Sequence, residues 1–84
     1  MTIQQREIEI ETMMKDIAVL GFKKLVLTPH ETAQIIGISV STLYNWRVEG
    51  VGPQFRKNGN GKRAKIMYPT RAVAEFMTET QLTA

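Results

Sequence analysis

The fold is decided by the stretch TPHETAQIIGISVSTLYNWRVEG, which comprises residues 28–50. It contains two short segments, 29–36 and 40–49, and each is followed directly by a glycine that can end a helix. The first segment follows Thr28, whose hydroxyl can make a capping box with Glu31 three residues later. The stretch therefore predicts two short helices joined by a tight turn.

Five residues of this stretch occupy the offsets that a helix-turn-helix requires. Ala33 is small enough for the first helix to cross the second closely, and Gly37, four residues later, tolerates positive φ in the turn. Ile38 supplies an apolar side chain that packs inside the turn between the two helices, while Leu43 and Trp46 anchor the second helix to the core. In such a unit the second helix enters the DNA major groove. An ordinary helical corner is the alternative that this spacing leaves open.

The side of the second helix turned away from its anchors is mostly polar and carries no acid before Glu49. Its DNA-binding candidates are Ser39, Ser41, Thr42, Tyr44, Asn45 and Arg47, and Val40 and Val48 complete the face. We expect the hydroxyls to meet phosphates, Asn45 to pair with adenine, and Arg47 to meet the backbone or a guanine. Alternatives stay open for each of these residues. They are a phosphate contact or no contact for Asn45, base contacts for Ser41 and Thr42, a partly buried packing role for Tyr44, and an exposed helix charge for Arg47.

A hairpin is predicted over residues 55–68, because two β-like runs flank the turn sequence Asn58-Gly59-Asn60-Gly61. Its DNA-binding candidates are five basic residues with no acidic residue between them, namely Arg56, Lys57, Lys62, Arg63 and Lys65. Alternation predicts Phe55, Ala64, Ile66 and Tyr68 pointing inward, with Arg56, Arg63 and Lys65 pointing outward. We expect contacts to the DNA backbone, with Lys62 or Arg63 reaching the minor groove. A solvated basic hairpin without a partner is the alternative.

The elements around this unit predict a mostly α fold with a small β-hairpin. A β-like run at 24–27 precedes the first of the two helices, and a last helix begins near Thr70. Two helices, a hairpin and a further helix in that order make a winged helix-turn-helix, here preceded by an extra N-terminal amphipathic helix. The expected organisation is an N-terminal helix over 1–22, a winged DNA-binding domain over 23–79 and a flexible tail over 80–84.

The N-terminal helix carries an apolar stripe at heptad spacing. The stripe comprises Ile3, Ile10, Met13, Ile17 and Leu20, and Arg6 interrupts it in the first heptad. Three arrangements remain open. The helix packs on its own winged domain, its stripe pairs with another copy or another protein, or it frays in solution. A homo-oligomer is therefore expected either through this stripe or between copies on adjacent DNA sites.

The residues of the two helices and the hairpin also resemble a known family, the excisionase-like group of MerR-type winged helices. The resemblance is carried by Leu27-Thr28-Pro29, Ala33, Gly37-Ile38-Ser39, Ser41-Thr42-Leu43-Tyr44-Asn45-Trp46, Glu49-Gly50, Gly52-Pro53-Gln54-Phe55, Lys57, Tyr68 and Val73-Ala74-Glu75-Phe76. It implies a DNA-binding protein of a phage or other mobile element. Such a protein assists a tyrosine recombinase (integrase) in excision, regulates transcription, or does both. The chain departs from the pattern at Ala72, where an acid is common, and in its N-terminal helix.

Composition limits the remaining function classes. The 84 residues include no Cys, one His and one Asp, so a disulfide scaffold is excluded and a catalytic triad is not expected. We expect a cytoplasmic, nucleoid-associated protein with no cofactor, no metal, no membrane partner and no enzymatic activity. The formal net charge is +3, yet residues 23–68 alone carry +6, which favours duplex DNA as the partner. The rival class is a protein-interaction module on the same scaffold that does not bind DNA.

Overall fold

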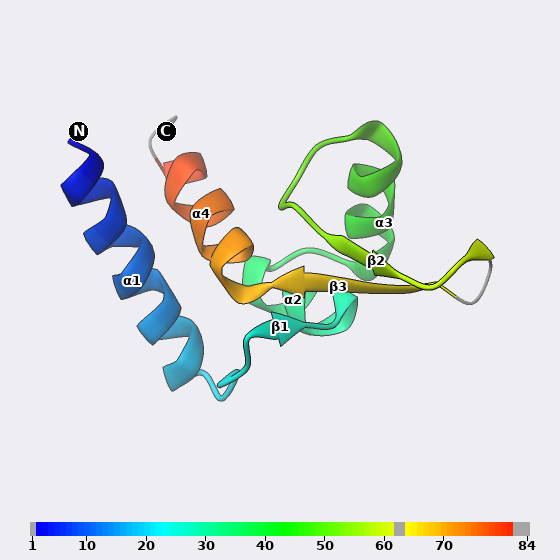
Figure 1. Cartoon of the computed structure of the whole chain (residues 1–84), viewed down its shortest axis with the longest axis horizontal. Helices are drawn as coiled ribbons and strands as arrows, with labels where there is room; N and C mark the ends of the chain where they lie inside the picture. Colours follow the sequence, from blue (N-terminus) through cyan, green and yellow to red (C-terminus); the bar gives the residue numbers. More distant parts are fainter. Residues whose placement is uncertain (1, 62–63, 82–84) are drawn as a thin grey trace.

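The computed structural model describes residues 2–61 and 64–81, with residues 80 and 81 described by their backbone only. Its elements are α1 (Ile3–Val19), β1 (Val26–Leu27), α2 (Pro29–Ile36), α3 (Val40–Glu49), β2 (Arg56–Asn58), β3 (Lys65–Pro69) and α4 (Thr70–Gln81). The strands form one antiparallel sheet in the order β1-β3-β2 (Figure 1). This confirms a mostly helical winged helix-turn-helix preceded by an extra helix. No helix in the described ranges is both long and apolar enough to cross a membrane.

Local capping defines the pair α2 and α3. The hydroxyl of Thr28 accepts from the Glu31 amide at 3.1 Å, and the Glu31 carboxylate accepts from the Thr28 amide at 2.9 Å. Helix α2 ends where Gly37 adopts a left-handed φ of 88°, and its amide donates to the Ala33 carbonyl at 2.8 Å. Ser39 then caps α3. The bounds predicted for both helices, 29–36 and 40–49, are therefore confirmed.

The segment leading into β1 is tied to both α2 and α4. Lys24 donates to the Glu31 carboxylate at 2.8 Å, and this hydrogen bond, with that from the Thr28 amide, lowers the pKa of Glu31 below its ordinary value of 4.5. On the other side, the Thr70 amide donates to the Leu25 carbonyl at 2.9 Å and the Thr70 hydroxyl to the Lys24 carbonyl at 2.6 Å. Thr70 is thus the first residue of α4 and also fixes the loop that precedes β1.

The core draws on every element except β2. Its fully buried apolar residues are Ile10, Ile17, Leu27, Ala33, Leu43, Tyr68, Val73 and Ala74. Burying one large aliphatic side chain contributes about 1.5–3 kcal/mol, so the two isoleucines of α1 are a substantial part of so small a core. Trp46 packs at its margin with its ring 5.5 Å from that of Phe76 on α4. Leu43 and Trp46 therefore anchor α3 as predicted.

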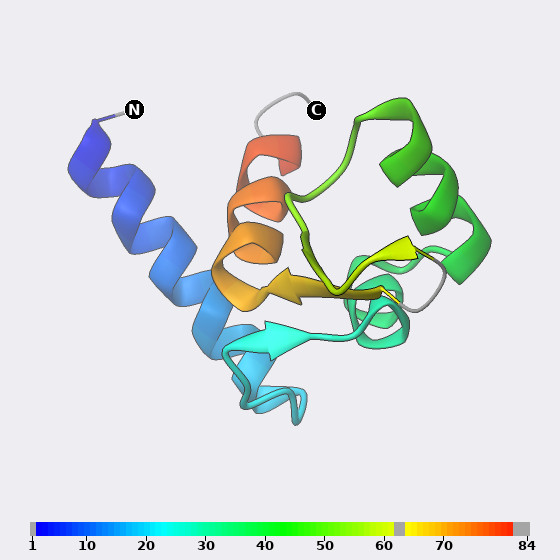
Figure 2. The ribbon, with the colours of Figure 1, turned by 45° about the vertical axis from the view of Figure 1, so that its right-hand side comes forward.

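Helix α1 packs along α4 through part of its predicted stripe (Figures 1 and 2). Ile10 and Ile17 are only 2% and 1% exposed, and Met13 is half-buried against them. The ends of the stripe lie in solvent, with Ile3 86% and Leu20 67% exposed. Of the three arrangements left open by the sequence, the structure has the intramolecular one. The central residues of the stripe thus contact the winged domain, and association with another copy or another protein through the stripe stays a prediction.

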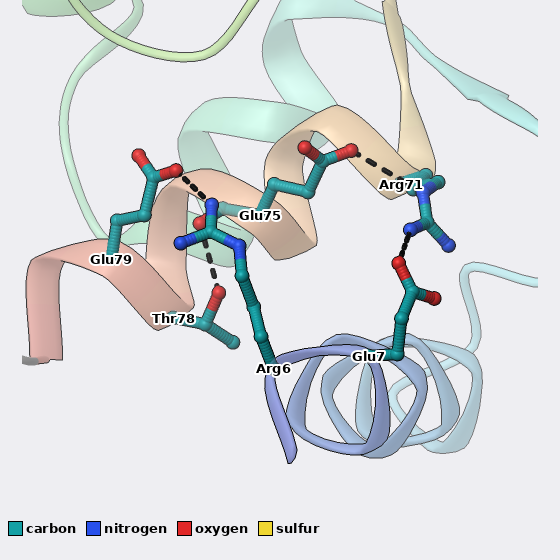
Figure 3. Close-up of polar contacts among 6 residues, drawn as sticks. All are labelled: Arg6, Glu7, Arg71, Glu75, Thr78 and Glu79. Atoms are coloured by element: carbon teal, nitrogen blue, oxygen red, sulfur yellow. Dashed lines mark hydrogen bonds and ion pairs between the residues drawn. The ribbon is translucent and has the colours of Figure 1, made fainter. Parts of the chain in front are cut away.

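Ion pairs flank this apolar contact on both sides (Figure 3). Arg6 of α1 pairs with Glu79 of α4, and Glu7 pairs with Arg71, which also contacts Glu75 at 3.3 Å. The hydrogen bond to Glu7 raises the pKa of Arg71 above its ordinary value. All five side chains are about half exposed, so solvent screens these pairs and each contributes little to stability. They join opposite sides of α1 to α4 (Figure 3).

The C-terminal end of the fold differs from the expectation. Helix α4 runs to Gln81, so residues 80 and 81 are helical and not part of a flexible tail as predicted; residues 82–84 lie outside the described part. The reason is local: no glycine or proline follows Pro69, so the helical hydrogen bonding continues. Pro69 itself closes β3 opposite Val26 of the edge strand β1.

The loop between α3 and β2 passes directly over Trp46. Gly52 in this loop has a φ of +87°, and a Cβ placed on it would lie 2.8 Å from Cε3 of Trp46. Gly50, which ends α3, has a similar φ of +77° but nothing within 4 Å of such a Cβ. The two glycines therefore share a left-handed conformation and differ in their surroundings.

Gly52→Ala is expected to lower the free energy of unfolding by about 2–4 kcal/mol, from left-handed strain and overpacking against Trp46. Gly50→Ala is the matched control and should cost only the strain, about 1–2 kcal/mol. Urea denaturation followed by Trp46 fluorescence measures both. Equal losses for the two variants would show that the loop does not press on the indole.

Candidate nucleic-acid interface

The free face of α3 is a polar surface with two apolar side chains on it. Tyr44 is 56% exposed, Val48 is 69% exposed, and Asn45 and Ser41 also lie in solvent. Leu43, on the opposite side, is fully buried. No residue in the described part of the chain makes a hydrogen bond to the side-chain amide of Asn45, so its donors and its acceptor remain available. More than half of Tyr44 lies in solvent and its ring contacts the Arg47 guanidinium, so Tyr44 lies outside the buried core.

The hydroxyls at the start of α3 have different roles. The Ser39 hydroxyl accepts from the Thr42 amide at 3.0 Å, and the two hydroxyl oxygens lie 2.9 Å apart. Ser39 is therefore the N-cap and Thr42 its partner, while Ser41 points into solvent. All three lie at the N-terminus of the helix, where free amides and the helix dipole favour an anion.

Arg47 makes two contacts within the protein that the sequence did not predict. Its Nη1 donates to the hydroxyl of Tyr68 on β3 at 3.0 Å, and its Cζ lies 5.5 Å from the centre of the Tyr44 ring. It is half-buried and so is not an exposed helix charge. The sequence predicted Tyr68 only as an inward residue of the hairpin. A buried tyrosine needs a partner for its hydroxyl, but nothing local indicates which one.

The hairpin presents its described cations on two faces. Arg56, Lys57 and Lys65 are all exposed, and β2 pairs with β3 so that Arg56 faces Met67 and Lys57 faces Ile66. Arg56 and Lys65 therefore share one face, as predicted, while Lys57 shares the other with Tyr68.

The inward and outward assignment of the hairpin is correct in part. Tyr68 is buried and Ile66 half-buried, as expected. Phe55 is 40% exposed, with its ring 6.0 Å from that of Tyr68. It precedes β2, so it only partly covers the tyrosine and does not enter the core. Lys62 and Arg63, the candidates for the minor groove, lie outside the described residues.

The two candidate surfaces lie at the same end of the molecule. Figures 1 and 2 show α3 and the β2–β3 hairpin together, with α1 at the opposite end. The charges follow this division, because residues 23–68 carry +6 and residues 1–22 carry −2. Within the described ranges, no group of three or more His, Asp or Glu side chains could hold a metal ion. The arrangement thus offers hydrogen-bonding groups and positive charge on one side of the protein.

Comparison with known families extends this description. A family model described as a helix-turn-helix domain matches residues 26–81, from β1 through α4. No curated protein and no solved structure matches the chain significantly. Helix α1 lies outside the matched range. The match covers two thirds of the chain and includes both helices whose caps and anchors are described above. The chain therefore belongs to the helix-turn-helix domain family, whose fold presents its second helix to DNA.

Proposed function

We propose that this protein binds duplex DNA in a sequence-dependent way and carries out no chemistry of its own. Helix α3 enters the major groove, and the β2–β3 hairpin follows the backbone or the adjacent minor groove. The observation that carries this proposal is the solvent-exposed polar face of α3 beside exposed cations at one end of the fold.

Within this interface some residues contact base edges and others contact the DNA backbone. Asn45, exposed and unpaired within the described chain, offers the donor and acceptor that pair with adenine. The start of α3, with Ser39, Ser41 and Thr42, receives a phosphate. The basic residues of the β2–β3 hairpin contact the DNA backbone and do not read the sequence. They are Arg56, Lys57, Lys62, Arg63 and Lys65.

We further propose that the protein acts in a phage or other mobile element, as an excisionase or a transcriptional regulator. The support is the resemblance of residues 25–78 to the excisionase-like group of MerR-type winged helices. One such module makes few base contacts, so specific recognition requires repeated sites and several copies of the protein on adjacent DNA. A tyrosine recombinase is the protein partner in excision, and the bacterial cytoplasm is the setting.

Binding to duplex DNA is expected to weaken steeply as salt rises, because each phosphate contact releases counterions. Lys57→Ala should weaken binding to every sequence alike and reduce the slope of log affinity against log salt by about 1. Lys15→Ala removes an exposed lysine from α1 and should leave the slope unchanged. Fluorescence anisotropy over a salt series measures the DNA affinity of the parent, Lys57→Ala and Lys15→Ala. Weak binding that does not depend on salt would favour the protein-interaction module.

Asn45→Ala is expected to cost about 1–3 kcal/mol of binding free energy, and only on duplexes that keep the base it reads. On duplexes substituted at that one position, the parent and the variant should bind equally. Gln4→Ala, which removes an exposed amide from α1, is the matched control and should change nothing. A uniform loss on all duplexes would refute the reading role of Asn45.

Footprinting on the DNA that flanks the native gene distinguishes the two proposed roles. We expect protection at direct repeats, spaced so that neighbouring copies lie side by side. Repeats beside a recombination site indicate excision, and repeats over a promoter indicate transcriptional control. The absence of any protected site would overturn both roles.

A further inference from the structure

Three side chains from two elements form a chain of contacts that leads out of the core onto the DNA-facing side of α3. Tyr68 of β3 is fully buried, and its hydroxyl accepts from Nη1 of Arg47 at 3.0 Å. The Arg47 guanidinium lies 5.5 Å from the centre of the Tyr44 ring. Tyr44 in turn is 56% exposed on the surface proposed to meet DNA. The chain therefore connects the hairpin strand to an exposed aromatic ring through one cation.

We infer that Arg47 is a positioning residue for recognition: bound by Tyr68, it holds the Tyr44 ring in its DNA-binding orientation and does not itself contact a phosphate. This rests on the proposed function of the α3 face. Among the candidate cations in the described chain, only Arg47 makes two contacts within the fold, a hydrogen bond to Tyr68 and a contact with the Tyr44 ring.

The physical basis is preorganisation. An exposed tyrosine on a helix samples several rotamers, and fixing one of them on binding costs the complex about 2- to 10-fold in affinity. A guanidinium under the ring, itself fixed by a hydrogen bond to a buried hydroxyl, selects one rotamer before DNA arrives. The Tyr44 ring is then ready to lie against a thymine methyl, and its hydroxyl to reach a phosphate.

This role is distinguishable from a phosphate contact by salt. An arginine that neutralises a phosphate adds about 1 to the salt slope, whereas one that acts through Tyr44 adds nothing. If Arg47 acts through Tyr44, substitutions at Tyr68 and Tyr44 have non-additive effects on DNA affinity, because both residues act through the same guanidinium.

Tyr68→Phe tests the inference, since it removes only the hydroxyl and keeps the buried ring. Binding to the duplex protected in the footprint should weaken about 2- to 10-fold, with the salt slope unchanged and binding to a scrambled duplex unaffected. In a Tyr44→Ala background the same substitution should have no further effect. Arg47→Gln should reproduce the loss, again without a change in slope. Thermal unfolding of each variant verifies that it folds.

A measurement without DNA keeps the inference separate from the proposed function. In the free protein, NMR relaxation of the aromatic carbons should show a more mobile Tyr44 ring in Tyr68→Phe than in the parent. An unchanged ring, a salt slope lowered by about 1 in Arg47→Gln, or additive losses would each overturn the positioning role. If the parent shows no salt-dependent binding to any duplex, the proposed function fails, while the NMR result still reports on the contact itself.

Discussion

The attachment of α3 to the rest of the protein is the constraint on which the other features depend. Leu43 is fully buried, and the Trp46 ring packs against Phe76 of α4 beneath the loop that contains Gly52. All of the strong apolar contact lies on one side of a helix only ten residues long. An isolated helix of that length is not stable in water, so this one exists because tertiary packing holds it. Its other side is consequently left for polar residues.

Helix α1 is connected to the candidate interface indirectly, through α4. It packs on α4, and α4 carries the phenylalanine against which Trp46 rests. The family match begins only at residue 26, so the domain's common part does not include this support. In this chain, Ile10 and Ile17 complete the core, and the ion pairs of Arg6 and Glu7 join the helix to α4. Helix α1 is therefore connected to α3 through a single intermediate helix, α4.

Features with local causes could be predicted from the sequence, and features with distant causes could not. The capping box at Thr28 and the turn at Gly37 act within four residues, so the bounds of α2 and α3 followed from spacing alone. The bond between Arg47 and Tyr68 joins residues 21 apart, and the docking of α1 joins opposite ends of the chain. The bond leaves no periodic signal. The heptad stripe of α1 shows that the helix has an apolar face, but not which surface covers that face. For this reason the exposed face of α3 was predictable, whereas the internal partner of Arg47 was not.

The separation of charge along the molecule has a kinetic consequence. The longest dimension is 41 Å, with the acidic helix α1 near one end and the basic hairpin at the other (Figure 1). At physiological ionic strength electrostatic forces decay over about 8 Å, so the carboxylates of α1 have little effect on an anion beside the hairpin. A polyanion that comes close to α1 is repelled, whereas one that comes close to the hairpin is attracted. For the proposed DNA binding, this asymmetry favours encounters in which the hairpin meets the duplex first.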